Sequence, residues 1–354
     1  MTSNRKNKRI IRNHMEKTGL NFLEAKLQLE ASGAISKPGD LRPSIGNPGE
    51  LLDLSPGPFQ GELNPFALGA PKSSSPLGKV IAVTSAKGGT GKSSVAVTLA
   101  AYLAQASKHG PVRPLKVLLL DMDVRDGQIG FFTGFWKPTV MKILRFGISE
   151  KQIEDTVIHD EGLGVDVLLA PRRPRSSDEL TPEFYEELIG KLRGTYDYII
   201  LDTSVNYLSP LMEKVALPQA DRIVLLVENL NSTAYASARW IREVTSKIEF
   251  EGMGIPKDRI SAILNKVRPG DDPEHSKKVI QNLQEIPIIG SIPLRSELFI
   301  DASNSQSMER VLEDPEIRGH VQAIVFSLVF GDISLDTFWD TSDWPRSGRP
   351  EVSN

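Results

Sequence analysis

The chain has 354 residues, of which 40% are hydrophobic and 25% charged, and its formal net charge at pH 7 is −3. It contains no cysteine, which excludes disulfides, thiolate nucleophiles, cysteine-based zinc sites and iron–sulfur clusters. No apolar run reaches the roughly 20 residues of a membrane-spanning helix, so we expect a cytoplasmic protein. Because the net charge is close to zero, we expect any basic surface to be local.

The sequence before the core predicts a basic helical hairpin followed by a linker. Residues 1–33 hold two short helical stretches, the first at about 5–17 and the second starting at the capping residue Asn21. The hairpin can be a solvated amphipathic element or a docking element for a protein, DNA or a membrane surface. Residues 34–78 are predicted to be a linker, because eight prolines and six glycines fall within positions 38–76, too many for regular elements.

From residue 79 onward, short apolar segments alternate with helical ones. The predicted strands are 80–84, 116–120, 165–169, 198–201, 222–227, 260–264 and 286–292. The predicted helices are 92–106, 182–193, 232–248, 273–284 and 315–329. The strands lack polar alternation, which is typical of strands buried on both faces. This order predicts an α/β domain over 79–330 with a doubly wound, mostly parallel sheet.

The end of the chain combines an apolar helix with an acidic tail. The last predicted helix is apolar all round and is interpreted as a core helix, so we expect peripheral membrane contact at most. Residues 331–354 carry five acidic residues against two arginines, with Phe338, Trp339 and Trp344 between them. This tail can be flexible and solvated, or its aromatic side chains can form a short docking motif for a protein partner.

A glycine-rich segment, Lys87-Gly-Gly-Thr-Gly-Lys-Ser-Ser94, lies between a predicted strand and a predicted helix. Glycines let the loop curl so that successive N–H groups converge on phosphate, and the helix N-terminus favours the same anion. Lys92 would neutralise the β- and γ-phosphates, and Ser93 would offer a hydroxyl to Mg²⁺. The predicted ATP or ADP contacts are Gly88, Gly89, Thr90, Gly91, Lys92, Ser93 and Ser94. The pattern is a P-loop with Ala86 in place of its first glycine.

The second lysine of the loop, Lys87, makes the segment similar to the deviant phosphate loop of the ParA/MinD ATPases. The resemblance implies an ATP-dependent homodimer in which Lys87 reaches the phosphates of the partner subunit. Charge supplied in trans, as by an arginine finger, couples hydrolysis to dimerisation. The resemblance therefore implies a slow ATPase that a partner stimulates.

Carboxylates follow two predicted strands, where ligands of a doubly wound sheet collect. Asp121-Met-Asp123 resembles the first switch of the family, which implies that Asp123 orients or activates the attacking water. Asp121 would help to hold the Mg²⁺ shell or the switch. Asp202 has Walker-B character and can hold Mg²⁺ directly or through water. It is followed by Thr203-Ser-Val-Asn206, where the family usually has proline.

Asn265 closes the sixth predicted strand and matches the adenine-contacting asparagine of the family. A side-chain amide both donates and accepts hydrogen bonds, which suits a base. The alternative is a turn-forming asparagine.

Within the family, the missing cysteines exclude the iron proteins and the arsenite- and tail-anchor-type ATPases. No tyrosine follows Tyr235, whereas the bacterial tyrosine kinases carry a Tyr-rich tail. The remaining positioning group comprises ParA, MinD, FlhG and CpaE/TadZ, and the stretch 168–202 looks most like CpaE/TadZ.

The resemblance implies a dimeric ATP switch that places a pilus, secretion or division machine, recruited to a pole, a membrane-associated machine or the nucleoid. One alternative is a ParA-like partition ATPase that binds nonspecific DNA. Its candidate basic patch consists of Lys266, Arg268, Lys277, Lys278 and Arg295. The other alternative is a nucleotide-binding scaffold with negligible hydrolysis, because residues 203–206 depart from the family pattern.

Overall fold

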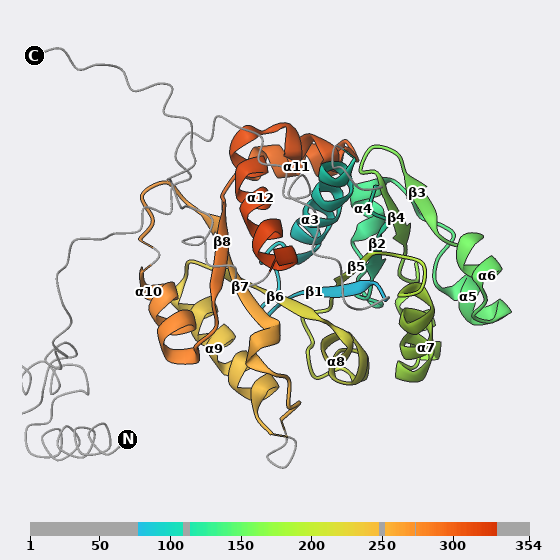
Figure 1. The fold of residues 1–354 in the computed structure, drawn as a ribbon, viewed down its shortest axis with the longest axis horizontal. Helices are drawn as coiled ribbons and strands as arrows, with labels where there is room; N and C mark the ends of the chain where they lie inside the picture. Colours follow the sequence, from blue (N-terminus) through green and yellow to red (C-terminus); the bar gives the residue numbers. More distant parts are fainter. Residues whose placement is uncertain (1–76, 109–113, 248–251, 273, 331–354) are drawn as a thin grey trace, which may run out of the picture. The chain divides into compact units, whose positions relative to one another are not determined.

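The computed structural model describes residues 77–108, 114–247, 252–272 and 274–330, which form an α/β fold (Figure 1). In this part of the chain, one eight-stranded sheet has the order β3-β4-β2-β5-β1-β6-β7-β8. The strands are β1 Lys79–Ser85, β2 Val117–Asp121, β3 Ile158–Asp160, β4 Val165–Leu168, β5 Tyr198–Asp202, β6 Arg222–Glu228, β7 Ile260–Val267 and β8 Ile288–Pro293. All neighbouring pairs are parallel except β3 with β4. The predicted mostly parallel sheet is therefore confirmed.

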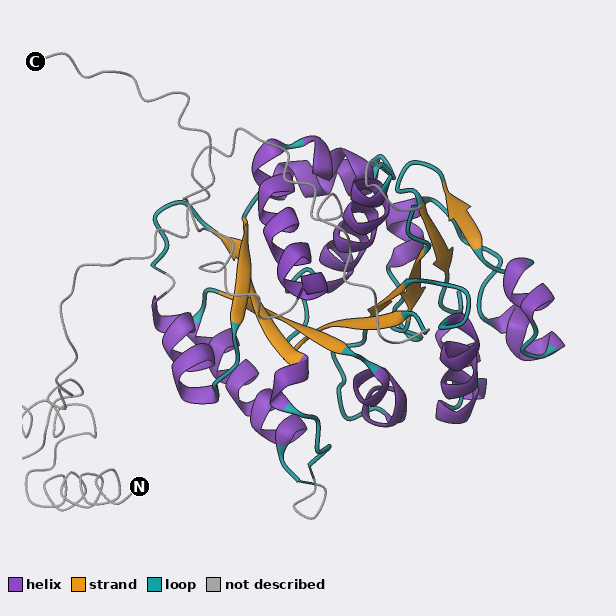
Figure 2. Cartoon of the chain, viewed as in Figure 1, coloured by secondary structure: helices purple, strands orange, loops and turns teal. Residues whose placement is uncertain are grey.

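Helices cover both faces of the sheet (Figure 2). The helices of the described residues are α3 Lys92–Ser107, α4 Ile129–Thr133, α5 Met141–Phe146, α6 Glu150–Glu154, α7 Pro182–Leu192, α8 Leu217–Gln219, α9 Asn231–Thr245, α10 Glu274–Lys277, α11 Ser296–Asn304 and α12 Pro315–Phe330. Helices α3, α11 and α12 lie on one face and α7, α8 and α9 on the other. None of these helices combines the length and the apolar character needed to cross a membrane.

The two-sided burial explains why the strands lack polar alternation. Along β1, Val80 and Ala82 belong to one core layer, whereas Ile81 and Val83 belong to the other. Successive side chains of a strand point to opposite faces, and here both faces of the sheet are buried. An unbroken run of apolar residues therefore supplies apolar side chains to both core layers.

The main predicted elements are found, with ends shifted by a few residues. The predicted helix 273–284 divides into α10 and a π-helical segment, Lys278–Asn282. The antiparallel edge strand β3 was not predicted, because its three residues, Ile-His-Asp, are only partly buried and carry no strand pattern. Helix α12 is confirmed as a core helix, since Val321, Ile324 and Val325 are fully buried. The predicted hairpin (1–33), the tail (331–354) and all but the last residues of the predicted linker lie outside the described residues.

Candidate functional site

The glycine-rich loop joins the central strand β1 to helix α3 at the carboxyl edge of the sheet. Gly91 adopts a left-handed φ of +91°, and a Cβ on it would lie 2.8 Å from Nδ2 of Asn265. Both features require glycine at this position. Helix α3 begins without a side-chain cap and without an acidic residue in its first turn. Its N–H groups and dipole therefore favour an anion at the loop.

Residues at the end of β7 hold the loop from the side. The Asn265 amide donates a 2.7 Å hydrogen bond to the Thr90 carbonyl. The Lys266 ammonium donates to the Gly89 carbonyl and forms a 2.8 Å ion pair with Glu228 at the end of β6. Lys266 has a φ of +58°, an uncommon conformation for a long side chain. These contacts hold the loop against the ends of β6 and β7.

Lys266 is a site residue that the sequence reasoning placed elsewhere, in the predicted DNA-binding patch. In the structure three members of that patch are paired with carboxylates: Lys266 with Glu228, Lys277 with Glu274 and Arg295 with Glu316. Arg268 and Lys278 form no ion pair with another described residue. The patch therefore offers less free positive charge than the sequence predicted.

A cavity of about 190 Å³ lies beside the loop, next to Gly91 and Ser94. Its other lining residues are Val95, Asn265, Lys266, Pro293, Leu294, Arg295, Ser296, Phe299 and Ile300. The lining combines apolar side chains such as Val95 and Phe299 with a few polar groups, among them the buried amide of Asn265, and a cavity of this kind suits a small-molecule ligand. Asn265 lies in its wall, where its amide donates to the loop, and its contact with adenine stays a prediction.

Asp202 ends β5 and is completely buried. Neither of its carboxylate oxygens has a hydrogen-bond partner. Burial raises its pKa to about 7, while the nearby Ser93 hydroxyl and Lys92 ammonium oppose this rise. A buried carboxylate without partners is costly unless a cation or a proton accompanies it.

Asp121 ends β2 directly opposite Asp202 in the register of the two strands. It accepts backbone hydrogen bonds from Asp123 N (3.2 Å) and Ile129 N (3.3 Å). Burial, followed by the negative charge of Asp202, raises its pKa. A Cβ on Gly127 would lie 2.6 Å from Oδ2 of Asp121, so glycine is needed for this close approach. Asp121 therefore organises the loop that carries Asp123.

Asp123 is half-buried, and burial raises its pKa while the Lys92 ammonium opposes the rise. The structure thus gathers Lys92, Ser93, Asp123 and Asp202 around the start of α3. Lys87 is exposed, and its side chain makes no ion pair with another described residue. Gly88 and Gly89 are also exposed at the tip of the loop.

The segment after Asp202 is attached to the core at two points that the sequence did not reveal. The Thr203 hydroxyl donates a 2.8 Å hydrogen bond to the Val83 carbonyl of β1. The Tyr207 hydroxyl donates to Glu243 of α9, and its ring packs edge-on against Trp240 at 6.4 Å. Val205 and Leu208 between and beyond these points remain exposed. The absence of proline is thus compatible with a defined conformation.

Magnesium fits the donor set of this site. Mg²⁺ prefers one or two carboxylate or hydroxyl oxygens, with phosphate and water completing its shell. Asp202 offers two unpartnered oxygens next to the Ser93 hydroxyl. Among the described residues, no cluster of three or more His, Cys, Asp or Glu could hold a metal ion, so a Mg²⁺ at Asp202 would need ligands from outside these side chains.

Residues 78–249 match a family profile described as an AAA domain. The septum site-determining protein MinD of Synechocystis sp. is 27% identical over 244 residues, which cover 68% of this chain and 85% of that protein. The ParA family ATPase from Chlorobium tepidum superposes with a TM-score of 0.60 at 19% identity, covering 72% of this chain and 100% of that one. The Mg-ADP complex of MinD from Pyrococcus horikoshii has a TM-score of 0.56 at 20% identity, covering 72% and 97%.

Proposed function

We propose that this chain, a P-loop ATPase of the ParA/MinD type, is an ATP-driven dimeric switch that positions a cellular machine. The observation that carries the proposal is the buried, unpartnered carboxylate of Asp202 beside Lys92 and Ser93. A divalent cation with a nucleotide phosphate chain would satisfy these oxygens and the open N–H groups of α3 at once.

Each group of the site then has a role in phosphoryl transfer. The N–H groups of residues 88–91 and the Lys92 ammonium bind the phosphates. Ser93 and Asp202 would hold Mg²⁺, which neutralises charge on the phosphates when bound. Asp123 orients the attacking water, and burial makes it a better proton acceptor. Asp121 keeps the Asp123 loop in place through its two backbone hydrogen bonds.

The surface around the loop supports a dimer closed over the nucleotides. Lys87 projects from the edge of the sheet without an ion pair to the described part of the chain, so it is free to reach a partner's phosphates. Val205, Leu208, Leu230 and Tyr235 are 38%, 62%, 49% and 59% exposed. They follow β5 and β6, the two neighbours of β1, and thus lie at the same edge as the loop. Exposed apolar side chains in one region are typical of an interface.

The biological output is proposed from the relatives. The MinD relative is described as a septum site-determining protein, and the ParA family ATPase and McdA structures have a similar fold. We infer placement of a division, partition, pilus or secretion machine, with a protein partner that stimulates turnover. In the partition alternative the cargo is DNA, and binding it would require free cationic side chains. The structure pairs three of the five candidate cations with carboxylates.

A second candidate is a nucleotide-binding scaffold with negligible turnover. It is favoured by the attachment of residues 203–207 to β1 and α9, which resists movement of this segment. Steady-state ATP hydrolysis of the wild type, Lys92→Ala and Asp123→Ala separates the candidates. Turnover that both substitutions abolish supports the switch, whereas wild-type turnover no higher than that of the variants supports the scaffold.

A further inference from the structure

Strand β7 carries a β-bulge next to the glycine-rich loop. Asn265 is paired with Ile292 of β8, and Val267 is paired with the next residue of that strand. Lys266 is therefore an extra residue on β7, without a counterpart on β8. Its φ of +58° lies in the left-handed region, which a long side chain rarely occupies. Bulges re-aim side chains, and backbone strain of this kind is typical of functional sites.

The bulge brings two consecutive side chains of β7 to the same loop. In a regular strand, neighbouring side chains point to opposite faces of the sheet. Here the Asn265 amide donates a 2.7 Å hydrogen bond to the Thr90 carbonyl. The next side chain, Lys266, donates to the Gly89 carbonyl. Glu228 of β6 forms a 2.8 Å ion pair with the same ammonium, which keeps the lysine in this position.

Holding these two carbonyls determines where the N–H groups of the loop point. The C=O and N–H bonds of a trans peptide are fixed in one plane and point in opposite directions. The Gly89 carbonyl shares its peptide with the Thr90 N–H, and the Thr90 carbonyl shares its peptide with the Gly91 N–H. Both N–H groups are therefore turned away from the side chains of β7. Neither donates a hydrogen bond to another group in the part of the chain that the structure describes.

We propose that Asn265 and Lys266 are positioning residues for phosphate binding, which hold the N–H groups of Thr90 and Gly91 in place before the anion arrives. Successive free N–H groups that point the same way form an anion-binding nest. A nest that is already ordered binds more tightly, because no ordering accompanies binding. The inference rests on the proposed nucleotide-binding function and adds to it a role for β7 that does not depend on the base.

A positioning role of Asn265 and a base contact lead to different expectations. If the amide acts through the loop, its removal weakens the binding of every ligand that carries the phosphates. If it acts on adenine, its removal weakens only the ligands that carry the base. Inorganic pyrophosphate with Mg²⁺ offers the phosphates alone, and ADP with Mg²⁺ offers both, so a comparison of the two ligands separates these roles.

Calorimetric titration of the full chain with each ligand measures the effect. Asn265→Ala should lower the affinity for pyrophosphate about tenfold and the affinity for ADP by the same factor.

Lys266 allows a test in which stability and binding are separated. Glycine adopts a φ of +58° without steric cost, whereas alanine keeps the strain. Lys266→Gly should therefore unfold at a higher urea concentration than Lys266→Ala, although both variants lack the contacts to Gly89 and Glu228. Both should bind pyrophosphate about tenfold more weakly than the wild type. A merely structural role of the lysine would make the more stable variant the tighter binder.

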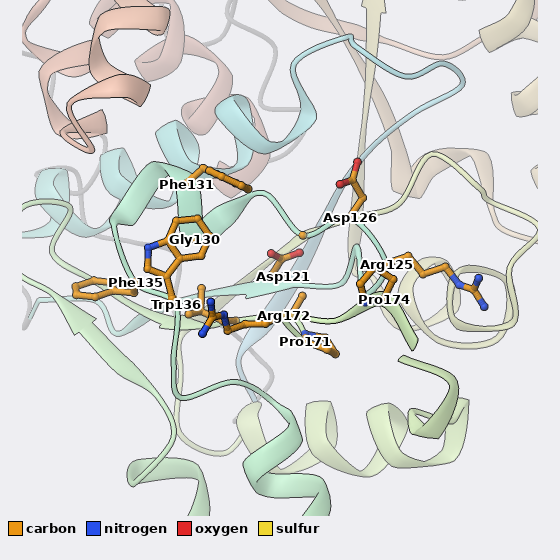
Figure 3. A pocket seen from close by; sticks show the side chains of 13 residues that line it. Asp121, Arg125, Asp126, Gly130, Phe131, Phe135, Trp136, Pro171, Arg172 and Pro174 are labelled. Atoms are coloured by element: carbon orange, nitrogen blue, oxygen red, sulfur yellow. The ribbon is translucent and has the colours of Figure 1, made fainter. Parts of the chain in front are cut away.

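Arg172 provides the control for a general loss of positive charge at this edge of the sheet. It follows β4 and lies in the wall of a second cavity, of about 290 Å³, between the segments that follow β2 and β4 (Figure 3). Its side chain is exposed and makes no ion pair with another described residue. Because solvent screens such a charge, Arg172→Ala should change the affinity for either ligand less than about twofold.

Unchanged pyrophosphate affinity in Asn265→Ala and in the two Lys266 variants would overturn the proposal. A loss in Asn265→Ala that is confined to ADP would make the amide a base contact and would also overturn it. The same holds for wild-type affinity in Lys266→Gly, and for an equal loss in Arg172→Ala, which would reduce the effect to net charge.

The proposed function can fail separately from this inference. Pyrophosphate affinity that depends on Asn265 and Lys266, in a chain without ATP turnover, would support the positioning role and contradict the proposed hydrolysis. A wild-type chain that binds neither pyrophosphate nor ADP would contradict both.

Discussion

Asp121 and Asp202 lie directly opposite each other at the carboxyl ends of the neighbouring strands β2 and β5, and both are almost completely buried. Burial raises the pKa of each, and the charge of Asp202 raises that of Asp121 further. Two adjacent buried carboxyl groups do not readily ionise together. We therefore infer that the nucleotide-free protein keeps a proton on this pair and releases it when a cation binds.

The first prediction concerns stability against pH. Asp202 has a pKa of about 7 in the fold and an ordinary value of 3.8, so the folded state binds more protons than the unfolded state between these values. Its contribution to the free energy of unfolding therefore falls as pH rises from about 4 to about 7. Asp202→Asn should remove this loss and raise the free energy of unfolding at pH 8 by about 1–3 kcal/mol.

Urea unfolding of the nucleotide-free wild type and Asp202→Asn at pH 5 and pH 8 measures this effect. The difference between the two proteins should be larger at pH 8. An equal difference at both values would show that the carboxyl pair does not carry the effect.

The second prediction concerns proton release. In the proposed site Mg²⁺·ADP would bind the ionised carboxylates, so its affinity should rise between pH 6 and pH 8, with protons released on binding. Calorimetry in two buffers of different ionisation enthalpy counts these protons. Asp202→Asn should lose both the proton release and the dependence on Mg²⁺. A wild type that binds without releasing protons would contradict the inferred shared proton.

The third prediction concerns Gly127. A Cβ there would lie 2.6 Å from Asp121 Oδ2 and 2.7 Å from the Cβ of Ala170, so Gly127→Ala should destabilise the protein by about 1–3 kcal/mol. The control is Gly190→Ala in α7, where a Cβ meets nothing within 4 Å and alanine should stabilise the helix by up to about 1 kcal/mol. Thermal unfolding of both variants is the measurement, and similar effects of the two substitutions would contradict the prediction.

The fourth prediction concerns the contact from β7 to the loop. Lys266→Ala removes the hydrogen bond to Gly89 and the ion pair with Glu228, so nucleotide affinity should fall about tenfold. Titration with a fluorescent ADP analogue measures the affinity. Arg268→Ala is the control, because its exposed side chain makes no ion pair with another described residue. Unchanged affinity in Lys266→Ala would show that the loop keeps its shape without this contact.

The parallel sheet could be predicted because its signal is local. A strand buried on both faces has a continuous apolar sequence, as in Val80–Val83, where alternate residues belong to different core layers. The loop could be predicted for the same reason, since strand, glycines, lysine and helix follow one another directly in the sequence. The strand β3 gives no such signal, and its position depends on pairing with β4 and on the 2.7 Å contact of His159 with Asp166.

The supporting contacts of the site could not be predicted, because they join residues far apart in the sequence. Lys266 reaches Gly89 across 177 positions, and its unusual φ is invisible in the sequence. Tyr207 and Glu243 likewise meet only after α9 has packed on the sheet. Sequence reasoning therefore proposed the groups that would face a nucleotide and missed the contacts Lys266–Gly89 and Tyr207–Glu243 that support them.

The most direct test of the proposed dimeric switch mixes two inactive variants. Lys87→Ala removes the charge offered to the partner, and Asp123→Ala removes the water-orienting carboxylate of the same subunit. A mixed dimer then contains one complete site, formed by Asp123 of the Lys87→Ala subunit and Lys87 of the Asp123→Ala subunit. Steady-state ATP hydrolysis of an equimolar mixture should recover to about a quarter of the wild-type rate. A mixture as inactive as its two components, beside an active wild type, would contradict the supply of Lys87 in trans.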